Sequence, residues 1–315
     1  MKKYIFSVFR FSVSFSLIYY LLWKYDFREL PSQITNVNYY FFFLAFITQL
    51  LTVFVGAYRW QTLLLGRDIS IGFKKLLSYG FIGLFFNLFL PGSSGGDFVR
   101  MYKVIDHTED KMYAGISVLA ERIIGTYTMI SFVLISCLFS FNLLPHELIF
   151  KIFSSVFVFF CVLILFICLK VWIIKMINKL PGKGKTLNKI KENVIIFYEA
   201  IHFFITHRKV LIKIMAISFL MQFFAIISCY FVARSIGLSL PVFYFFIFVP
   251  IMFFVTAIPI SLSGIGVREG VFVYLFREVG VPSNTALMVS LLFFSLGIFI
   301  GLIGGVVHFW SDMRK

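Results

Sequence analysis

The sequence predicts an all-α protein that crosses a membrane several times, and three observations favour this fold class. Hydrophobic residues make up 60% of the 315 positions, more than soluble domains usually contain. Several apolar segments reach the length of about 20 residues that a spanning helix needs. Most of the 29 Lys and Arg residues also fall on one side of the resulting topology, as expected for cytoplasmic loops. We therefore expect a single integral membrane domain over residues 1–315, in the plasma (inner) membrane of a prokaryote, with both termini in the cytoplasm.

About six segments are predicted to be full transmembrane helices, at 5–23, 38–57, 113–141, 149–170, 209–234 and 284–308. The first follows Met1-Lys2-Lys3 without a small-residue cleavage pattern, so we expect it to be retained, as an uncleaved signal anchor would also be. The second is predicted to end before Arg59, which begins the positive charges of a cytoplasmic loop. The four cysteines lie in apolar segments without metal or disulfide spacing, which is typical of small core residues. No cofactor or metal is expected.

Two further apolar segments, 76–90 and 242–258, are shorter and end at Pro91 and Pro259. Their lengths are at or below the minimum for a spanning helix. We therefore expect two re-entrant helical hairpins, near 76–103 and 242–278, in which irregular backbone at membrane depth contacts protein, water or a ligand. Two short full crossings with short returns would fit the charge distribution equally well.

The longest polar segment, 175–209, contains apolar residues at spacings of three and four from Leu187 to Phe204, which predicts an amphipathic helix. With the lysines beside it, this helix is expected to lie on the inner membrane surface and contact anionic lipid. An ordinary charged connector is the alternative. Because the net charge of +15 follows the topology, no nucleic-acid partner is expected.

The two hairpins carry a related sequence. PGSSGGDFVR (91–100) aligns without gaps on PISLSGIGVR (259–268), with matches at Pro91/Pro259, Ser93/Ser261, Gly96/Gly264, Val99/Val267 and Arg100/Arg268. In the predicted topology the first copy enters from inside and the second from outside. This arrangement is typical of the inverted repeats of secondary transporters.

Each break is predicted to start a helix inside the membrane, where free N–H groups and the positive dipole end favour an anion. Arg100 and Arg268, on the first turns, would add charge-assisted contacts to an anionic lipid headgroup. The residues expected to shape or line this site are Ser93, Ser94, Gly95, Gly96, Asp97, Ser263 and Gly264. Alternatively, Asp97 caps a helix while Arg100 extends to the headgroup region.

Glu121 and Arg122 form the other charged pair in an apolar segment. Because neighbours in sequence do not face each other on a helix, each needs its own partner. We expect them to share a polar cavity with Arg100 or Arg268, although a span that starts at Ile123 would leave them at the interface. Glu269, beside Arg268, is a candidate either for proton coupling or for a counter-charge. Lone amides such as Gln49, Asn87 and Gln222 more often form hydrogen bonds between helices.

Three ordered motifs, L-P-G-S-S-G-G-D-x-x-R (90–100), A-E-R (120–122) and S-G-I-G-V-R-E (263–269), resemble those of the flippase-like integral membrane family. This family is also called the lysylphosphatidylglycerol synthase transmembrane region, and the similarity covers nearly the whole chain. It implies motif positions at Pro91, Gly92, Gly95, Gly96, Asp97, Arg100, Glu121, Arg122, Gly264, Gly266, Arg268 and Glu269. In the multiple peptide resistance factors this region moves a modified lipid between leaflets and precedes a soluble synthase domain. The present sequence ends just after its last apolar segment, so we expect that domain to be absent and the chain not to be an enzyme.

Three functions follow from this reasoning. The leading one is a transporter that moves an anionic lipid through a polar cavity between the repeats; the lipid would be a phospholipid, an aminoacyl-phospholipid or a polyprenyl-phosphate-linked lipid. The second is the membrane part of a lipid-modifying enzyme resembling a phosphatidylglycerol lysyltransferase. The third is a scaffold of envelope biogenesis that transports nothing. Membrane lipids are the expected partners, with a separate lipid-modifying enzyme or a second copy of the chain as further candidates.

Overall fold

The computed structural model describes residues 37–66, 68–89, 95–108, 111–139, 207–257, 261 and 264–313. The regular elements of these segments are all helices, which confirms the all-α prediction for this part of the chain. They are α3 (Tyr39–Leu65), α4 (Phe73–Phe89), α5 (Gly95–Ile105), α6 (Lys111–Phe139), α9 (Arg208–Ser235), α10 (Val242–Ala257), α11 (Val267–Arg277) and α12 (Ser283–Met313). The expected spans at 5–23 and 149–170 and the expected surface helix at 187–204 lie outside the described residues.

Four long helices match predicted spans: α3, α6, α9 and α12. Of these, α3, α9 and α12 are long and apolar enough to cross a membrane. The main difference concerns α3, which does not end near residue 57 but continues to Leu65. It continues because Trp60, Leu63 and Leu64 extend its helical period and are fully buried. The prediction that the helix ends before the charge of Arg59 is therefore wrong. Arg59 is buried within α3.

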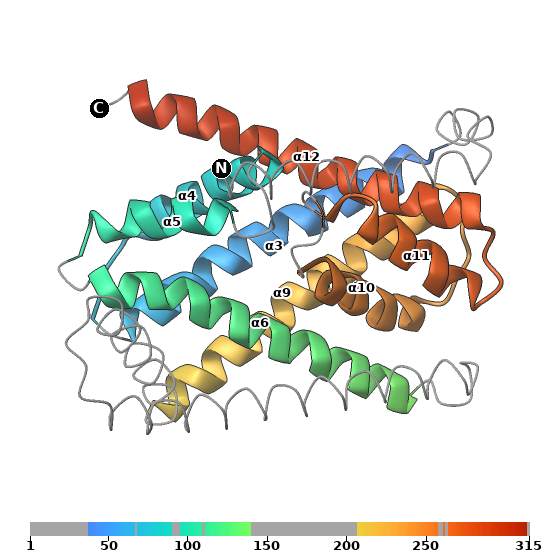
Figure 1. Ribbon diagram of the computed structural model, residues 1–315, viewed down its shortest axis with the longest axis horizontal. Helices are drawn as coiled ribbons and strands as arrows, with labels where there is room; N and C mark the ends of the chain where they lie inside the picture. Colours follow the sequence, from blue (N-terminus) through green and yellow to red (C-terminus); the bar gives the residue numbers. More distant parts are fainter. Residues whose placement is uncertain are drawn as a thin grey trace, which may run out of the picture.

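The two central helices, α3 and α9, cross in antiparallel directions. The backbone N–H of Asn38, at the start of α3, donates to the carbonyl of Ser235 at the end of α9 over 2.7 Å. Towards the other end, Arg59 of α3 donates to the hydroxyl of Ser218 on α9. Figure 1 shows this crossing at the centre of the molecule.

The described helices form two series with the same order of lengths. A helix of 27 residues is followed by helices of 17, 11 and 29 residues in the first series. The second series has 28, 16, 11 and 31 residues. The two series therefore share a plan of one long, two short and one long helix.

The packing follows the same plan. Each helix of the first series has a counterpart in the second: α3 corresponds to α9, α4 to α10, α5 to α11 and α6 to α12. Corresponding helices make corresponding contacts. Helix α4 packs on α12 as α10 packs on α6, and α5 packs on α6 as α11 packs on α12. The contact between α3 and α9 maps onto itself. A half turn about their crossing in Figure 1 brings α4 and α5 onto α10 and α11. Because α3 and α9 are antiparallel, the two series run in opposite directions.

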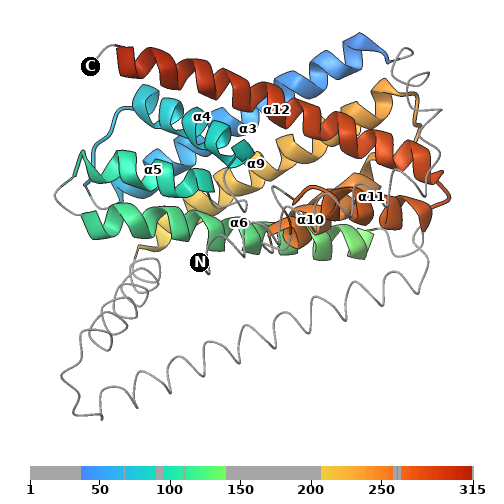
Figure 2. The same ribbon diagram turned by 45° about the horizontal axis from the view of Figure 1, so that its top comes forward.

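The short helices pack in pairs at opposite ends of the molecule. Helix α4 contacts α5, and α10 contacts α11, and both views place the first pair at one end and the second at the other (Figures 1 and 2). The first pair packs backbone to backbone, because a Cβ added to Gly96 would lie 1.9 Å from the carbonyl oxygen of Gly83. Paired helices therefore occupy both regions where the sequence predicts hairpins.

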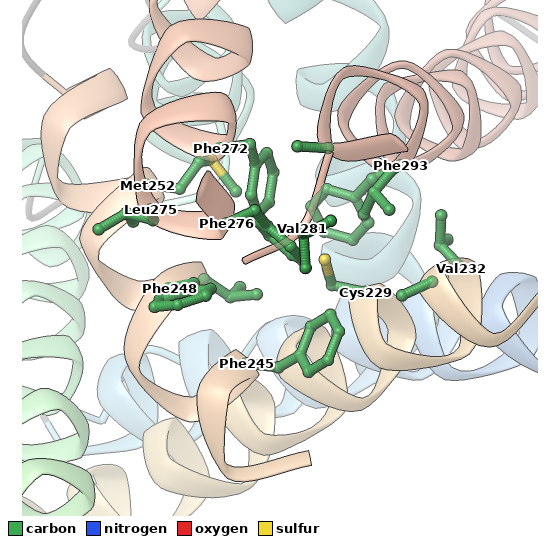
Figure 3. Close-up of a cluster of buried hydrophobic side chains, with 14 of the residues drawn as sticks. Cys229, Val232, Phe245, Phe248, Met252, Phe272, Leu275, Phe276, Val281 and Phe293 are labelled. Carbon is green, nitrogen blue, oxygen red and sulfur yellow. The ribbon is translucent and has the colours of Figure 1, made fainter. Parts of the chain in front are cut away.

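Two apolar cores hold this arrangement together. The larger joins α9, α10, α11 and α12, and Figure 3 shows Cys229, Phe245 and Phe276 among the side chains that meet there. Cys229 is fully buried, as the sequence predicts for a core cysteine. The smaller core, around Trp60 and Leu76, joins α3, α4, α5, α6 and α9, and the charged residues described next lie beside it.

Candidate functional site

Glu121 is the centre of a buried ion-pair network that links α3, α5 and α6. Its Oε1 accepts a hydrogen bond from Nε of Arg59 at 3.2 Å, and its Oε2 accepts one from a terminal nitrogen of Arg100 at 2.7 Å. The carboxylate is only 3% exposed. One acidic side chain is thus shared by two guanidinium groups from different helices.

Asp97 extends the network towards the surface. It accepts hydrogen bonds from Arg100 at 3.4 Å and from Nε of Arg122 at 2.5 Å. Exposure of the side chains rises along the series, from 3% for Glu121 to 18% for Arg100 and 36% for Arg122. The network therefore has a buried end at Glu121 and a partly exposed end at Arg122.

The buried end of this network holds one donor that is not used. Three guanidinium groups, those of Arg59, Arg100 and Arg122, gather around the carboxylates of Glu121 and Asp97. Among the residues that the structure describes, the buried Nε of Arg100 has no hydrogen-bond partner. A buried cation is costly unless it is paired and fully hydrogen-bonded. This nitrogen can therefore donate to an acceptor oxygen of a further anionic group.

Trp60 fixes the position of the Arg100 guanidinium. The central carbon of that group lies 4.2 Å from the centroid of the Trp60 ring, in the range of a cation–π contact. The indole N–H of Trp60 donates to the hydroxyl of Ser117 on α6 at 3.0 Å. On the other side, Arg59 donates to Ser218 of α9 at 3.3 Å, so the network also contacts the second series of helices.

Small residues and an amide place α5 so that Arg100 reaches this position. A Cβ on Gly83 would lie 2.7 Å from the methylene carbons of Arg100, so only glycine leaves room for that side chain. The Oδ1 of Asn87 on α4 accepts the backbone N–H of Gly96 at 2.7 Å. This N–H group at the start of α5 was expected to face a ligand; it is instead bonded to the preceding helix.

A second charged cluster surrounds Arg268 at the start of α11. Arg268 pairs with Glu269 and donates to the hydroxyl of Ser290 on α12 at 3.3 Å. Its guanidinium carbon lies 4.0 Å from the centroid of the Phe294 ring. Glu269 also accepts the backbone N–H of Gly266 at 2.6 Å, which caps the helix. Here one cation faces one anion, and Glu269 serves as a counter-charge.

A family model described as the lysylphosphatidylglycerol synthase TM region matches residues 7–305. The chain belongs to this family. Among its relatives, the UPF0104 membrane protein PH1989 of Pyrococcus horikoshii is 24% identical, with 98% of this chain and 96% of the relative aligned. The UPF0104 membrane protein MJ1078 of Methanocaldococcus jannaschii is 26% identical, with 74% of this chain and 96% of the relative aligned. No solved structure matches the chain. Membership confirms the resemblance inferred from the motifs, and with the apolar helices it establishes a membrane protein of prokaryotes.

The charged motif positions of the synthase TM-region family fall into the two clusters, whereas Pro91 and Gly92 lie outside the described residues. Each residue of the Glu121-Arg122 pair has its own partner, as expected, and Arg100 rather than Arg268 joins them. Arg268 has a separate set of partners on α11 and α12, and α11 lies at the end of the molecule opposite α5 (Figures 1 and 2). The lipid-headgroup role of these residues stays a prediction.

The glycines of the predicted breaks have identifiable roles. Gly264 and Gly266 have φ of 76° and 84°, a conformation that strains residues with a side chain. Gly95 and Gly96 are buried at the start of α5. Ser93, Ser94 and Ser263 lie outside the described residues.

Arg59 is the site residue that sequence reasoning missed. Its position after an apolar segment favoured a cytoplasmic loop, but the structure places it in α3 with 8% exposure. The helical spacing of the apolar residues after it was the signal that could have identified a longer helix.

Proposed function

We propose that this protein moves an anionic lipid between the two leaflets and binds the phosphate of the headgroup at the Arg59–Arg100–Arg122 network. The observation that carries the proposal is the buried Nε of Arg100, which has no hydrogen-bond partner among the described residues although three guanidinium groups gather at this site. A phosphate would supply negative charge and several acceptor oxygens, which arginine binds with good geometry. The partly exposed Arg122 is the first contact, and the unpartnered Nε of Arg100 is a donor further inside.

The fold supports a carrier mechanism. We propose that α4–α5 and α10–α11 are re-entrant hairpins that enter from opposite sides, with both termini in the cytoplasm. The two series of helices that run in opposite directions support an inverted repeat, and such repeats exchange access by rocking against each other around a fixed site. The pairing of α3 with α9, which maps onto itself, would form the axis of that motion.

Arg268 has a different role in this proposal. Glu269 neutralises it, and the pair joins α11 to Ser290 on α12. We therefore assign the Arg268 cluster to holding the second hairpin in place, and the Arg100 cluster to binding the anion.

The test uses the purified full chain in liposomes with acyl-labelled fluorescent lipids. Wild type is expected to move phosphatidylglycerol and phosphatidic acid faster than zwitterionic phosphatidylcholine. Arg100→Gln should slow the anionic lipids by about tenfold or more, the loss of one charge-assisted contact. Arg277→Gln is the matched control, because Arg277 is exposed at the end of α11, and it should behave as wild type. Equal rates for wild type and Arg100→Gln would contradict the proposal, as would equal movement of all three lipids by the wild-type protein.

The family description favours a second candidate, the membrane part of a lipid-modifying enzyme, because it names a synthase. Incubation of the chain with phosphatidylglycerol and lysyl-tRNA distinguishes the two. Formation of lysyl-phosphatidylglycerol by the purified chain would favour the enzyme, whereas lipid movement without a new product favours the carrier.

A further inference from the structure

Two glutamines at the α3/α9 interface each bury a polar atom that makes no hydrogen bond to any residue that the structure describes. These atoms are Oε1 of Gln49 on α3 and Nε2 of Gln222 on α9. Gln222 is only 6% exposed. A buried amide group without a partner costs about 1–3 kcal/mol, so an interface designed only for packing would carry apolar residues here. Interhelical hydrogen bonding, which the sequence favours for lone amides, therefore does not account for these two atoms.

The two amides share one stretch of the interface, near the middle of both helices. Gln222 lies at the centre of the 28-residue α9, and Gln49 is within one turn of the centre of the 27-residue α3. Helix contacts bracket them on both sides, because Ser228 donates to the carbonyl of Ala45 and Arg59 donates to Ser218. With a rise of about 1.5 Å per residue, Gln222 is roughly 20 Å from both ends of α9, and Gln49 is roughly 15 Å from one end of α3 and 24 Å from the other. In helices that cross a membrane, positions this far from both ends lie in the bilayer interior, where no water satisfies polar groups.

Polar side chains connect the arginine network to the amides along the α3/α9 interface. Arg59 donates to Ser218, and Gln222 follows Ser218 by four residues on α9, which is about one helical turn of 5.4 Å on the same face. A headgroup whose phosphate binds near Arg59 could therefore extend a further polar group to Gln222 and, beyond it, towards Gln49, which is ten residues from Arg59 on α3, or about 15 Å along the helix. A hydroxyl fits best, since it both donates and accepts and can satisfy an amide oxygen as well as an amide nitrogen.

We propose that Gln49 and Gln222 form an uncharged subsite for a hydroxyl group of the lipid headgroup. The preferred substrate is then an anionic lipid with a hydroxylated headgroup, such as glycerol or a sugar, rather than a bare phosphate. The inference rests on the proposed lipid transport. Because the α3/α9 contact maps onto itself when the two series are exchanged, the subsite lies on the axis between the halves, where a midplane site is reachable from either side.

The experiment compares phosphatidylglycerol, whose headgroup has two hydroxyls, with phosphatidic acid, which has none, in the same liposomes. The measured quantity is the ratio of their initial transfer rates. Wild type should favour phosphatidylglycerol, and Gln222→Met and Gln49→Met, which keep the side-chain length, should each lower the ratio about three- to tenfold. Thr48→Val is the matched control beside Gln49, because the Thr48 hydroxyl already donates to the carbonyl of Leu44 at 2.8 Å; its ratio should equal that of wild type.

The two proposals fail in different ways. If wild type moves both anionic lipids at one rate, or if both methionine variants keep the wild-type ratio, the hydroxyl subsite is overturned while arginine-dependent transport stands. If wild type moves neither lipid, transport fails and the subsite fails with it.

Thermal stability gives a readout independent of transport. Since the two amide atoms have no partner to lose, Gln222→Met should leave the Tm in detergent unchanged or raise it. A lower Tm would show that the amide joins the helices, and would overturn its assignment as a binding group.

Discussion

The pairing of Arg59 with Glu121 allows a quantitative test of the network. The two charged groups lie 3.2 Å apart, with side chains 10% and 3% exposed. At an effective dielectric constant of about 20 their attraction is about 5 kcal/mol, before the cost of burial is counted. Removing one partner of a buried pair typically costs about 3–5 kcal/mol, because the other charge stays buried. Glu121→Gln should show this full loss, since it leaves both Arg59 and Arg100 without their shared carboxylate. Arg59→Met should cost only about 1–3 kcal/mol, because Glu121 keeps Arg100.

The measurement is the free energy of unfolding of the purified protein in mixed detergent micelles, for wild type, each single variant and the double variant. Because the two residues are in direct contact, their losses should not add, and the double-mutant cycle should give a coupling energy of about 1–3 kcal/mol. Additivity within about 0.5 kcal/mol would refute the direct pairing. A greater loss for Arg59→Met than for Glu121→Gln would refute the central position of Glu121.

Two further predictions concern packing. Gly304→Ala should lower the Tm, because its Cβ would lie 2.0 Å from the carbonyl oxygen of Phe81 and would push α12 away from α4. Gly297→Ala is the control on the same helix. Its Cβ meets nothing within 4 Å, so the Tm should stay unchanged or rise. Equal melting temperatures for the two variants would disprove close helix packing at position 304. Trp60→Phe keeps an aromatic ring beneath the guanidinium of the network but loses the hydrogen bond to Ser117 and leaves a cavity in the core, so it should cost about 2–3 kcal/mol of unfolding free energy. A loss above about 5 kcal/mol would show that the indole does more than fill the core and orient the ring.

The positions of the helices could largely be predicted from the sequence, since they depend on local properties. Length and apolarity locate α9 and α12 within a few residues, and Pro91, Pro259 and the glycines identify the two places where short helices meet. The end of α3 was predicted too early, although the spacing of Trp60, Leu63 and Leu64 continues the helical period. What the sequence could not supply is the partner that makes a buried charge compatible with that helix, because the partner of Arg59 is 62 residues away in sequence.

The pairing of the charged side chains was only partly predictable. The sequence shows that Glu121 and Arg122 need partners, because both lie in an apolar segment, but it cannot choose between Arg100 and Arg268. That choice depends on which short helix packs on α6, and α5 does so whereas α11 packs on α12. The two amide atoms without a hydrogen-bond partner could not be predicted for the same reason. The sequence around a glutamine does not show whether a neighbouring helix offers its side-chain amide a hydrogen bond.

The two halves share their contacts but differ in charge, and this difference decides how the aligned arginines should be interpreted. The alignment of Arg100 with Arg268 predicts equal roles, yet the acid that neutralises Arg268 is the next residue in the chain, whereas Arg100 shares its acids with two other arginines. The neighbouring carboxylate of Glu269 neutralises Arg268 and removes its net attraction for an anion. The buried Nε of Arg100, in contrast, still lacks an acceptor among the described residues. If the halves rock about α3 and α9, one charged site near the axis is sufficient for transport, because the motion changes which side can reach it. A second cationic site would instead hold the anion more tightly and slow its release. For the proposed carrier, the neutralised Arg268–Glu269 pair is therefore consistent with a single anion site, and the repeat would contribute symmetry of motion without symmetry of binding.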